Sequence, residues 1–101
     1  MTILFKAPRE VAEVREIPNT LKALQELVGG YIEATPFDGD LRLVVNEEGK
    51  LMRLEPNVLA PTFDVLVGPV VVTAYDGKGD FRSLTEAEIY FSKEYLTDCE
   101  V

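Results

Sequence analysis

LQELVGGYIE, residues 24–33, decides how this chain folds, because a helix pattern passes into a strand pattern with only two glycines between them. Gly29 stands where the end of a helix favours a left-handed backbone, a conformation that is costly for residues with a Cβ atom. Gly30 allows a tight reversal or the close approach of another backbone, and the residues after it favour a strand. The stretch therefore predicts a corner where a helix ends and a strand begins.

The helix before this corner is expected over residues 21–28. Pro18 ends the preceding segment, and Asn19 or Thr20 can cap the first helical turn. The apolar side chains that share one face are Leu21, Leu24, Leu27 and Val28. Because a helix of this length is marginal alone, we expect this face to pack against a sheet.

The predicted strands cover residues 2–6, 12–17, 31–35, 41–45 and 51–54, and a last strand lies in the apolar run 65–75. The first two should form an antiparallel pair, and the next three should form a meander with turns at 36–40 and 46–50. The last strand holds the most apolar run, so we expect it to be buried on both faces and to start at Pro69. Residues 55–64 contain two prolines and are expected to form a surface loop.

A second helix is expected after the glycine-rich turn at 76–80. Thr85 and Glu88 match the capping-box pattern, and Leu84 with Ile89 matches a hydrophobic staple. The last residues, 96–101, are expected to fray. These elements predict a single α+β domain over residues 1–101, in which two helices pack against a mostly antiparallel sheet of five to six strands.

The composition is that of an acidic, water-soluble protein. No apolar run approaches the roughly 18 residues that a membrane span needs, and the N-terminus lacks the apolar core of a secretory signal. We therefore expect a cytoplasmic protein without membrane contact. Eighteen acidic residues against ten basic ones give a formal charge of −8, which repels phosphate backbones. The charge either keeps the protein soluble or fits a basic groove on another protein.

Residue types that catalysis or metal binding usually needs are scarce. The chain has no histidine and one cysteine, Cys99, which excludes histidine-dependent triads and cysteine clusters. The acidic turn at 76–80 lacks the ordered series of ligands of a calcium loop, and turn chemistry explains its residues. Glu47 and Glu48 are adjacent, but neighbouring residues on a strand point to opposite faces. We predict no catalytic residue, no metal site and no cofactor.

The paired glycines offer one alternative site, since exposed N–H groups can hold an anion. However, phosphate-binding glycines of the common kinds precede a helix, whereas these follow one. A ligand bound at this corner would be lined by Gly29, Gly30 and Tyr31.

Several blocks of the sequence resemble a family of small proteins of unknown function from phages, prophages and other mobile elements of gut and related bacteria. The blocks are NTLKALQELVGGYIE at 19–33, NEEGK at 46–50, LEPN at 54–57, DVLVGPVVVT at 64–73 and DFRSLTEAEI at 80–89. Their order matches over roughly residues 1–95, and VGGYIE and NEEGK are the most specific. The resemblance implies a biological context and transfers no catalytic motif.

Two functions fit these observations. The first is a non-enzymatic inhibitor that binds a host defence protein, for example a CRISPR nuclease, through its acidic turns. The contact candidates are Asp38, Asp40, Glu47, Glu48, Asp76 and Asp80. The second is an oligomeric sponge that sequesters a small nucleotide signal at the glycine corner, although the chain has no dense cluster of arginine and lysine. A homo-oligomer could form through an edge strand or the valine-rich run.

Overall fold

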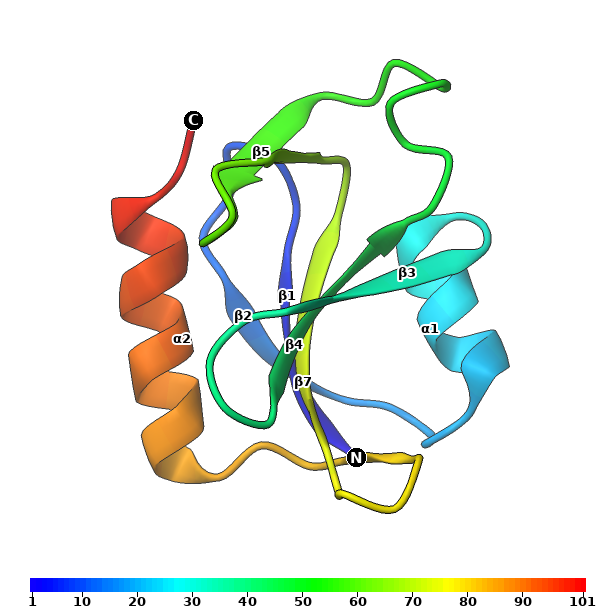
Figure 1. Cartoon of the computed structure of the whole chain (residues 1–101), viewed down its shortest axis with the longest axis vertical. Coiled ribbons are helices and arrows are strands. Elements are labelled where there is room, and N and C mark those ends of the chain that lie inside the picture. The colour runs from blue at the N-terminus through cyan, green and yellow to red at the C-terminus, as the bar shows by residue number, and fades with distance from the viewer.

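The structure is a computed structural model that describes residues 1–101. A six-stranded antiparallel sheet forms its centre (Figure 1). The elements are β1 (Thr2–Lys6), β2 (Glu13–Glu16), α1 (Leu21–Val28), β3 (Ile32–Pro36), β4 (Leu41–Asn46), β5 (Pro56–Leu59), β6 (Val65–Val67), β7 (Val70–Tyr75), β8 (Phe81–Arg82) and α2 (Glu86–Asp98). The sheet has the order β2-β1-β7-β4-β3, with β8 paired to β7, while β5 and β6 form a second, two-stranded sheet. The predicted α+β class with two helices is therefore confirmed.

The corner between α1 and β3 forms as the sequence predicts. The Thr20 hydroxyl accepts the amide of Ala23 at 3.1 Å and caps α1. Gly29 ends the helix with φ of 81°, the left-handed region that favours glycine. Gly30 lies against Asn46, because a Cβ atom at Gly30 would stand 3.0 Å from the Asn46 amide nitrogen. The chain can therefore turn from helix to strand without a linker.

The two helices lie on opposite sides of the sheet (Figure 1). On one face, α2 and the small sheet cover a core that includes Leu4, Leu41, Leu43, Val45, Val58, Leu66, Val70, Val72, Leu84 and Leu96. On the other face, Leu24 and Val28 of α1 cover Ile3, Val44 and Val71. Val70, Val71 and Val72 are completely buried, so β7 is buried on both faces as predicted. The helical stripe of α1 is narrower than predicted, since Leu21 is 58% exposed.

The expected strand over 51–54 is wrong, and with it the meander. Residues 47–53 form consecutive turns, after which the Leu54 amide donates to the Gly49 carbonyl at 3.0 Å, and Leu51 is 83% exposed. The second neighbour of β4 is β7, with Leu43 opposite Val72. The physical reason is burial, because β7 offers β4 a buried and mostly apolar partner, whereas a short run such as LMRL carries too little periodicity to specify a strand.

The loop expected over 55–64 contains β5, which pairs with β6 across a bulge after Pro56. The apolar run over 65–75 forms two strands, β6 and β7, separated by Gly68, whose φ is 73°, and Pro69. The strand expected to start at Pro69 is β7, which begins at Val70. Proline at an edge position is compatible with such pairing, which is why two prolines did not exclude a strand here.

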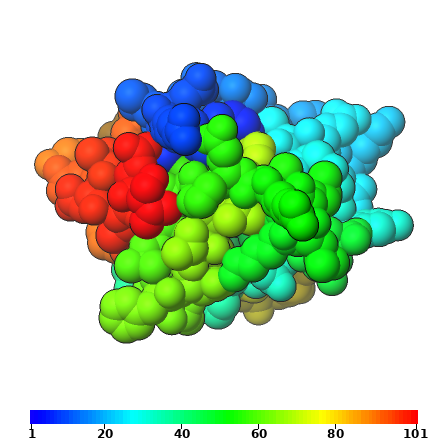
Figure 2. All heavy atoms as spheres, turned by 90° about the horizontal axis from the view of Figure 1, so that it is seen from above, coloured from blue at the N-terminus to red at the C-terminus, as the bar shows by residue number.

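The expected fraying of residues 96–101 is also contradicted. The helix α2 continues to Asp98, and Leu96 is completely buried. After it, the Val101 amide donates to the Asn57 carbonyl at 3.1 Å, and the buried Lys6 ammonium pairs with Glu100 at 2.8 Å. Figure 2 shows this C-terminal segment, in red, packed against the rest of the domain. Residues of β1 and β5, which are distant in the sequence, hold the tail in place, so no local sequence signal could predict its order.

Neither helix is long and apolar enough to span a membrane.

Candidate functional site

Two hairpin turns meet at one end of the sheet and bring four of the six predicted acids together. The β3–β4 turn carries Asp38 and Asp40, and the β7–β8 turn carries Asp76 and Asp80. The turns are neighbours because β4 pairs with β7, and the Tyr75 amide donates to the Asp40 carbonyl at 2.8 Å. We call these two turns, residues 37–40 and 76–80, the turn end (Figure 1).

Two acids of the turn end hold the backbone of their own turn. The Asp76 carboxylate accepts the amides of Lys78 at 2.6 Å and of Asp80 at 3.2 Å. The Asp80 carboxylate accepts the Phe81 amide at 2.8 Å. These contacts are typical of aspartate in tight turns and account for the acidic sequence of the loop.

An ion-pair network connects the turn end to α2. Arg82 donates to both carboxylate oxygens of Glu88, at 2.8 and 3.0 Å, and its guanidinium lies 3.7 Å from Asp40. The hydrogen bonds from Arg82 lower the pKa of Glu88 to about 2, against the opposing effect of burial. The same pairing raises the pKa of Arg82. Asp40 and Glu88 are therefore partly neutralised within the chain.

Asp38 differs from these acids, because its carboxylate forms no hydrogen bond or ion pair with the rest of the chain. It borders a hollow of about 300 Å³ between the β3–β4 turn and α2. The hollow is lined by Asp38, Gly39, Asp40, Leu41, Ala87, Glu88 and Phe91. Phe91 is 42% exposed and packs on Phe37, with ring centroids 5.5 Å apart. An apolar wall with a carboxylate rim suits a lysine or arginine side chain, whose stem is apolar and whose head is cationic.

Glu47 and Glu48 lie at the opposite end of β4, so the predicted acids form two groups rather than one. Both residues are exposed, and neither carboxylate has a partner in the chain. The Glu47 amide donates to the Tyr31 carbonyl at 2.8 Å, which places these acids beside the glycine corner.

The amides of the glycine corner are already engaged. Gly29 and Gly30 both donate to the Gln25 carbonyl, at 2.8 and 3.1 Å, so neither N–H is directed at a ligand. Tyr31 is 67% exposed. The corner is held by Asn46, whose side chain donates to the Val28 carbonyl at 3.1 Å and accepts the Glu48 amide at 2.8 Å. The one sequence signal for Asn46 is its place as a polar residue between an apolar strand and an acidic turn.

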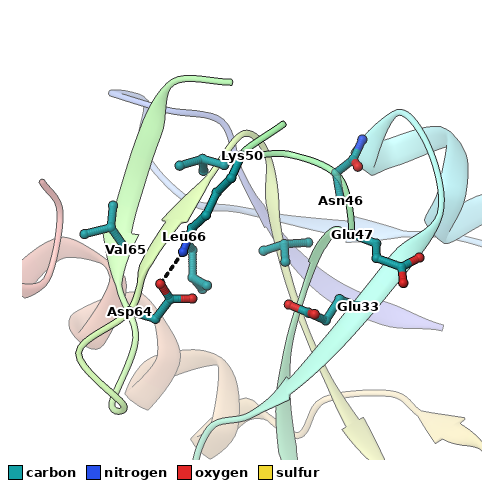
Figure 3. A pocket seen from close by; sticks show the side chains of 9 residues that line it. Glu33, Asn46, Glu47, Lys50, Asp64, Val65 and Leu66 are labelled. Atoms are coloured by element: carbon teal, nitrogen blue, oxygen red, sulfur yellow. Dashed lines mark hydrogen bonds and ion pairs between the residues drawn. The ribbon is translucent and has the colours of Figure 1, made fainter. Parts of the chain in front are cut away.

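A groove of about 280 Å³ separates the main sheet from β6 (Figure 3). It is lined by Glu33, Val45, Asn46, Glu47, Lys50, Asp64, Val65, Leu66 and Val67. The Lys50 ammonium forms an ion pair with Asp64 across this groove. Figure 3 shows the Glu33 carboxylate turned toward the groove and that of Glu47 turned away from it. Glu33 and Asp64 come from separate strand regions, so only the tertiary fold brings them to one site.

No curated protein and no solved structure matches this chain at a significant level. A family model described as "Domain of unknown function (DUF3846)" matches residues 1–97, which is nearly the whole chain. This agrees with the expected membership of a family without an assigned function. The chain belongs to the DUF3846 family.

Proposed function

We propose that this chain is a non-enzymatic inhibitor encoded by a phage or another mobile element, and that it binds the basic nucleic-acid groove of a host defence protein. A CRISPR nuclease is the first partner to test. The observation that supports this proposal is the turn end, where several carboxylates gather and Asp38 has no partner within the chain. The resemblance to proteins of mobile elements supplies the biological context.

Charge supports the proposal because a net charge of −8 attracts a basic groove over a distance and orients the approach. The three unpartnered predicted acids are Asp38 at one end of β4 and Glu47 and Glu48 at the other. A strand of six residues spans roughly 20 Å, so these carboxylates could follow a groove built for several successive phosphates. Binding of this kind weakens as the salt concentration rises.

The test compares two triple charge reversals of equal net charge. The first variant carries Asp38→Lys, Glu47→Lys and Glu48→Lys, none of which removes a contact within the chain. The control carries Glu10→Lys, Glu26→Lys and Asp98→Lys, three exposed positions that belong to neither acidic group. Each protein is added to DNA-cleavage assays with a panel of CRISPR nucleases.

The wild type and the control are expected to inhibit at least one nuclease, and the first variant is expected to lose this inhibition. Two outcomes contradict the proposal. One is that the wild type inhibits no nuclease. The other is that both triple variants behave alike, because net charge rather than these acids would then decide the effect.

The alternative proposal, an oligomeric sponge for a nucleotide signal, has less support. The amides of Gly29 and Gly30 are bound to Gln25, and Tyr31 alone of the three expected residues offers an exposed side chain. Isothermal titration with cyclic nucleotides tests it directly, and the absence of heat would remove it.

A further inference from the structure

We infer that the free edge of β3 binds an extended segment of a partner protein in which basic and apolar residues alternate. The groove shares Glu47 with the acids proposed to contact a nuclease, but the inference rests on the edge of β3 and does not depend on inhibition of a nuclease. Its elements are the exposed edge of β3, the groove beside Glu33 and the side of the sheet that α1 covers.

The edge of β3 has backbone groups available for pairing. β3 is the last strand of the sheet and pairs only with β4. The Glu47 amide donates to the Tyr31 carbonyl, and the Phe37 amide donates to the Leu41 carbonyl, so odd-numbered residues of this segment face β4. The alternation of an antiparallel ladder therefore directs the N–H and C=O groups of Ile32 and Ala34 outward. Pro36 has no N–H and limits the pairing surface to these two residues.

The side chains of β3 divide between two chemically different faces. Glu33 stands opposite Val45 and lines the groove between the main sheet and β6. Ile32 and Ala34 are partly buried and pack against the core beneath α1. A strand added to this edge would therefore place alternate side chains beside the acidic groove and beside an apolar surface.

The negative charge of the groove favours basic residues at the positions of the added strand that face it. Glu33 and Asp64 line it together with Lys50, and Lys50 is already paired with Asp64. A lysine or arginine opposite Glu33 would form a cross-strand ion pair with its carboxylate. Apolar residues would occupy the positions between, opposite Ile32 and Ala34.

A second copy of this chain fits the edge less well than a basic segment does. An antiparallel pair of β3 strands centred on Ala34 would place Pro36 opposite Ile32 and remove a donor at each end. It would also bring together two molecules that each carry a charge of −8. Charge complementarity therefore favours a basic partner over self-association.

The test uses a fluorescein-labelled peptide of alternating valine and lysine, with binding followed by fluorescence anisotropy at low salt. In the inferred complex, the valines carry the backbone groups that pair with Ile32 and Ala34. N-methylation of two central valines should weaken binding by at least about tenfold, whereas N-methylation of the lysines should change it little. The folded protein is identical in both measurements.

A charge exchange provides the second arm. Glu33→Lys should weaken binding of the valine–lysine peptide by about fivefold and should favour a valine–glutamate peptide instead. Glu10→Lys is the matched control, since it makes the same charge change at an exposed position between β1 and β2, at the other edge of the sheet, and should leave peptide binding almost unchanged. The inference is overturned by absence of binding, by equal weakening from both methylation patterns, or by concentration-dependent dimers in sedimentation that Glu33→Lys disrupts.

Discussion

Arg82 and Glu88 form a bidentate ion pair between β8 and the first turn of α2, with nitrogen-to-oxygen distances of 2.8 and 3.0 Å. Glu88 also accepts the Thr85 amide at 2.9 Å, while its own amide donates to the Thr85 hydroxyl at 3.2 Å. One carboxylate therefore completes the capping box of α2 and fixes that helix to the β7–β8 hairpin. The relative position of α2 and the turn end depends on this residue.

Glu88→Gln is expected to lower the free energy of unfolding by about 1–2 kcal/mol at neutral pH, because the charged hydrogen bonds from Arg82 are lost in a partly solvated site. Glutamine preserves the capping box, so α2 should remain folded. The measurement is urea denaturation, with Glu86→Gln as the control, since Glu86 lies in the same turn without a partner. Equal stability of the two variants would contradict the structural role of the pair.

The same pair predicts an acid-dependent loss of stability. The pKa of Glu88 is lowered from its usual value of 4.5 to about 2 in the folded protein. Its contribution is therefore complete above pH 4.5 and is lost as the pH falls through about 2. Unfolding curves of the wild type and Glu88→Gln should differ most above pH 4.5 and approach each other in strong acid. A difference that stays constant down to pH 2 would exclude Arg82 as the cause.

Asn46 is expected to control the order of the glycine corner. It is buried and connects the Val28 carbonyl with the Glu48 amide. Asn46→Asp removes the donor to Val28 and buries a carboxylate, so the free energy of unfolding should fall by about 2 kcal/mol. Glu47→Gln, at an exposed neighbouring position without a side-chain partner, should have almost no effect. Hydrogen exchange of the amides at 47–54 measures the local change, and unchanged protection in Asn46→Asp would contradict this role.

Local sequence signals predicted the elements whose causes are local. The left-handed Gly29, the Thr85–Glu88 capping box and a cap of α1 at Asn19 or Thr20 each depend on contacts within a few residues. Each is present, and Thr20 is the cap. The buried β7 was also predictable, because its valine run requires burial on both faces. The fold class followed from these elements.

The remaining features depend on partners that are distant in the sequence. The pairing of β4 with β7 and the docking of the C-terminus join segments separated by tens of residues, so neither the false strand at 51–54 nor the frayed tail could be corrected locally. The pairing of β4 with β7 also divides the predicted acids into two groups. It brings Asp38 close to Asp76, whereas Glu47 lies at the other end of β4. The groove beside Glu33 was missed because Asp64 reaches it only through the small sheet.

The C-terminus is expected to stabilise the whole domain. A chain that ends at Asp98 loses Glu100, the carboxylate beside the buried Lys6 ammonium, and the amide of Val101 that donates to Asn57. The free energy of unfolding should fall by about 3 kcal/mol, because the buried Lys6 ammonium loses its ion pair, although it keeps its hydrogen bond to Asn57, and because backbone groups lose their partners. Glu100→Gln, which preserves the backbone contacts, should cost less than half as much. Urea denaturation measures both, and a truncated chain as stable as the wild type would show that the docked tail contributes nothing.

Tyr95 is expected to make the domain sensitive to alkaline pH. Its hydroxyl donates to the Leu59 carbonyl at 2.7 Å, and burial, with a smaller effect of Cys99, raises its pKa to about 12. Because the folded protein holds the Tyr95 proton more tightly than the unfolded chain does, the contribution of this hydroxyl to stability is complete below pH 10 and is lost as the pH rises through about 12.

Tyr95→Phe keeps the ring contact with Phe37 and should lower the free energy of unfolding by about 1 kcal/mol at neutral pH. Tyr31→Phe, at an exposed hydroxyl without a partner, should leave stability unchanged. In an absorbance titration of the four tyrosines, the component near pH 12 should be absent from Tyr95→Phe, and persistence of that component would assign it to another tyrosine. The hydrogen bond to Glu94 also raises the pKa of Tyr90, so a second late component should remain in this variant.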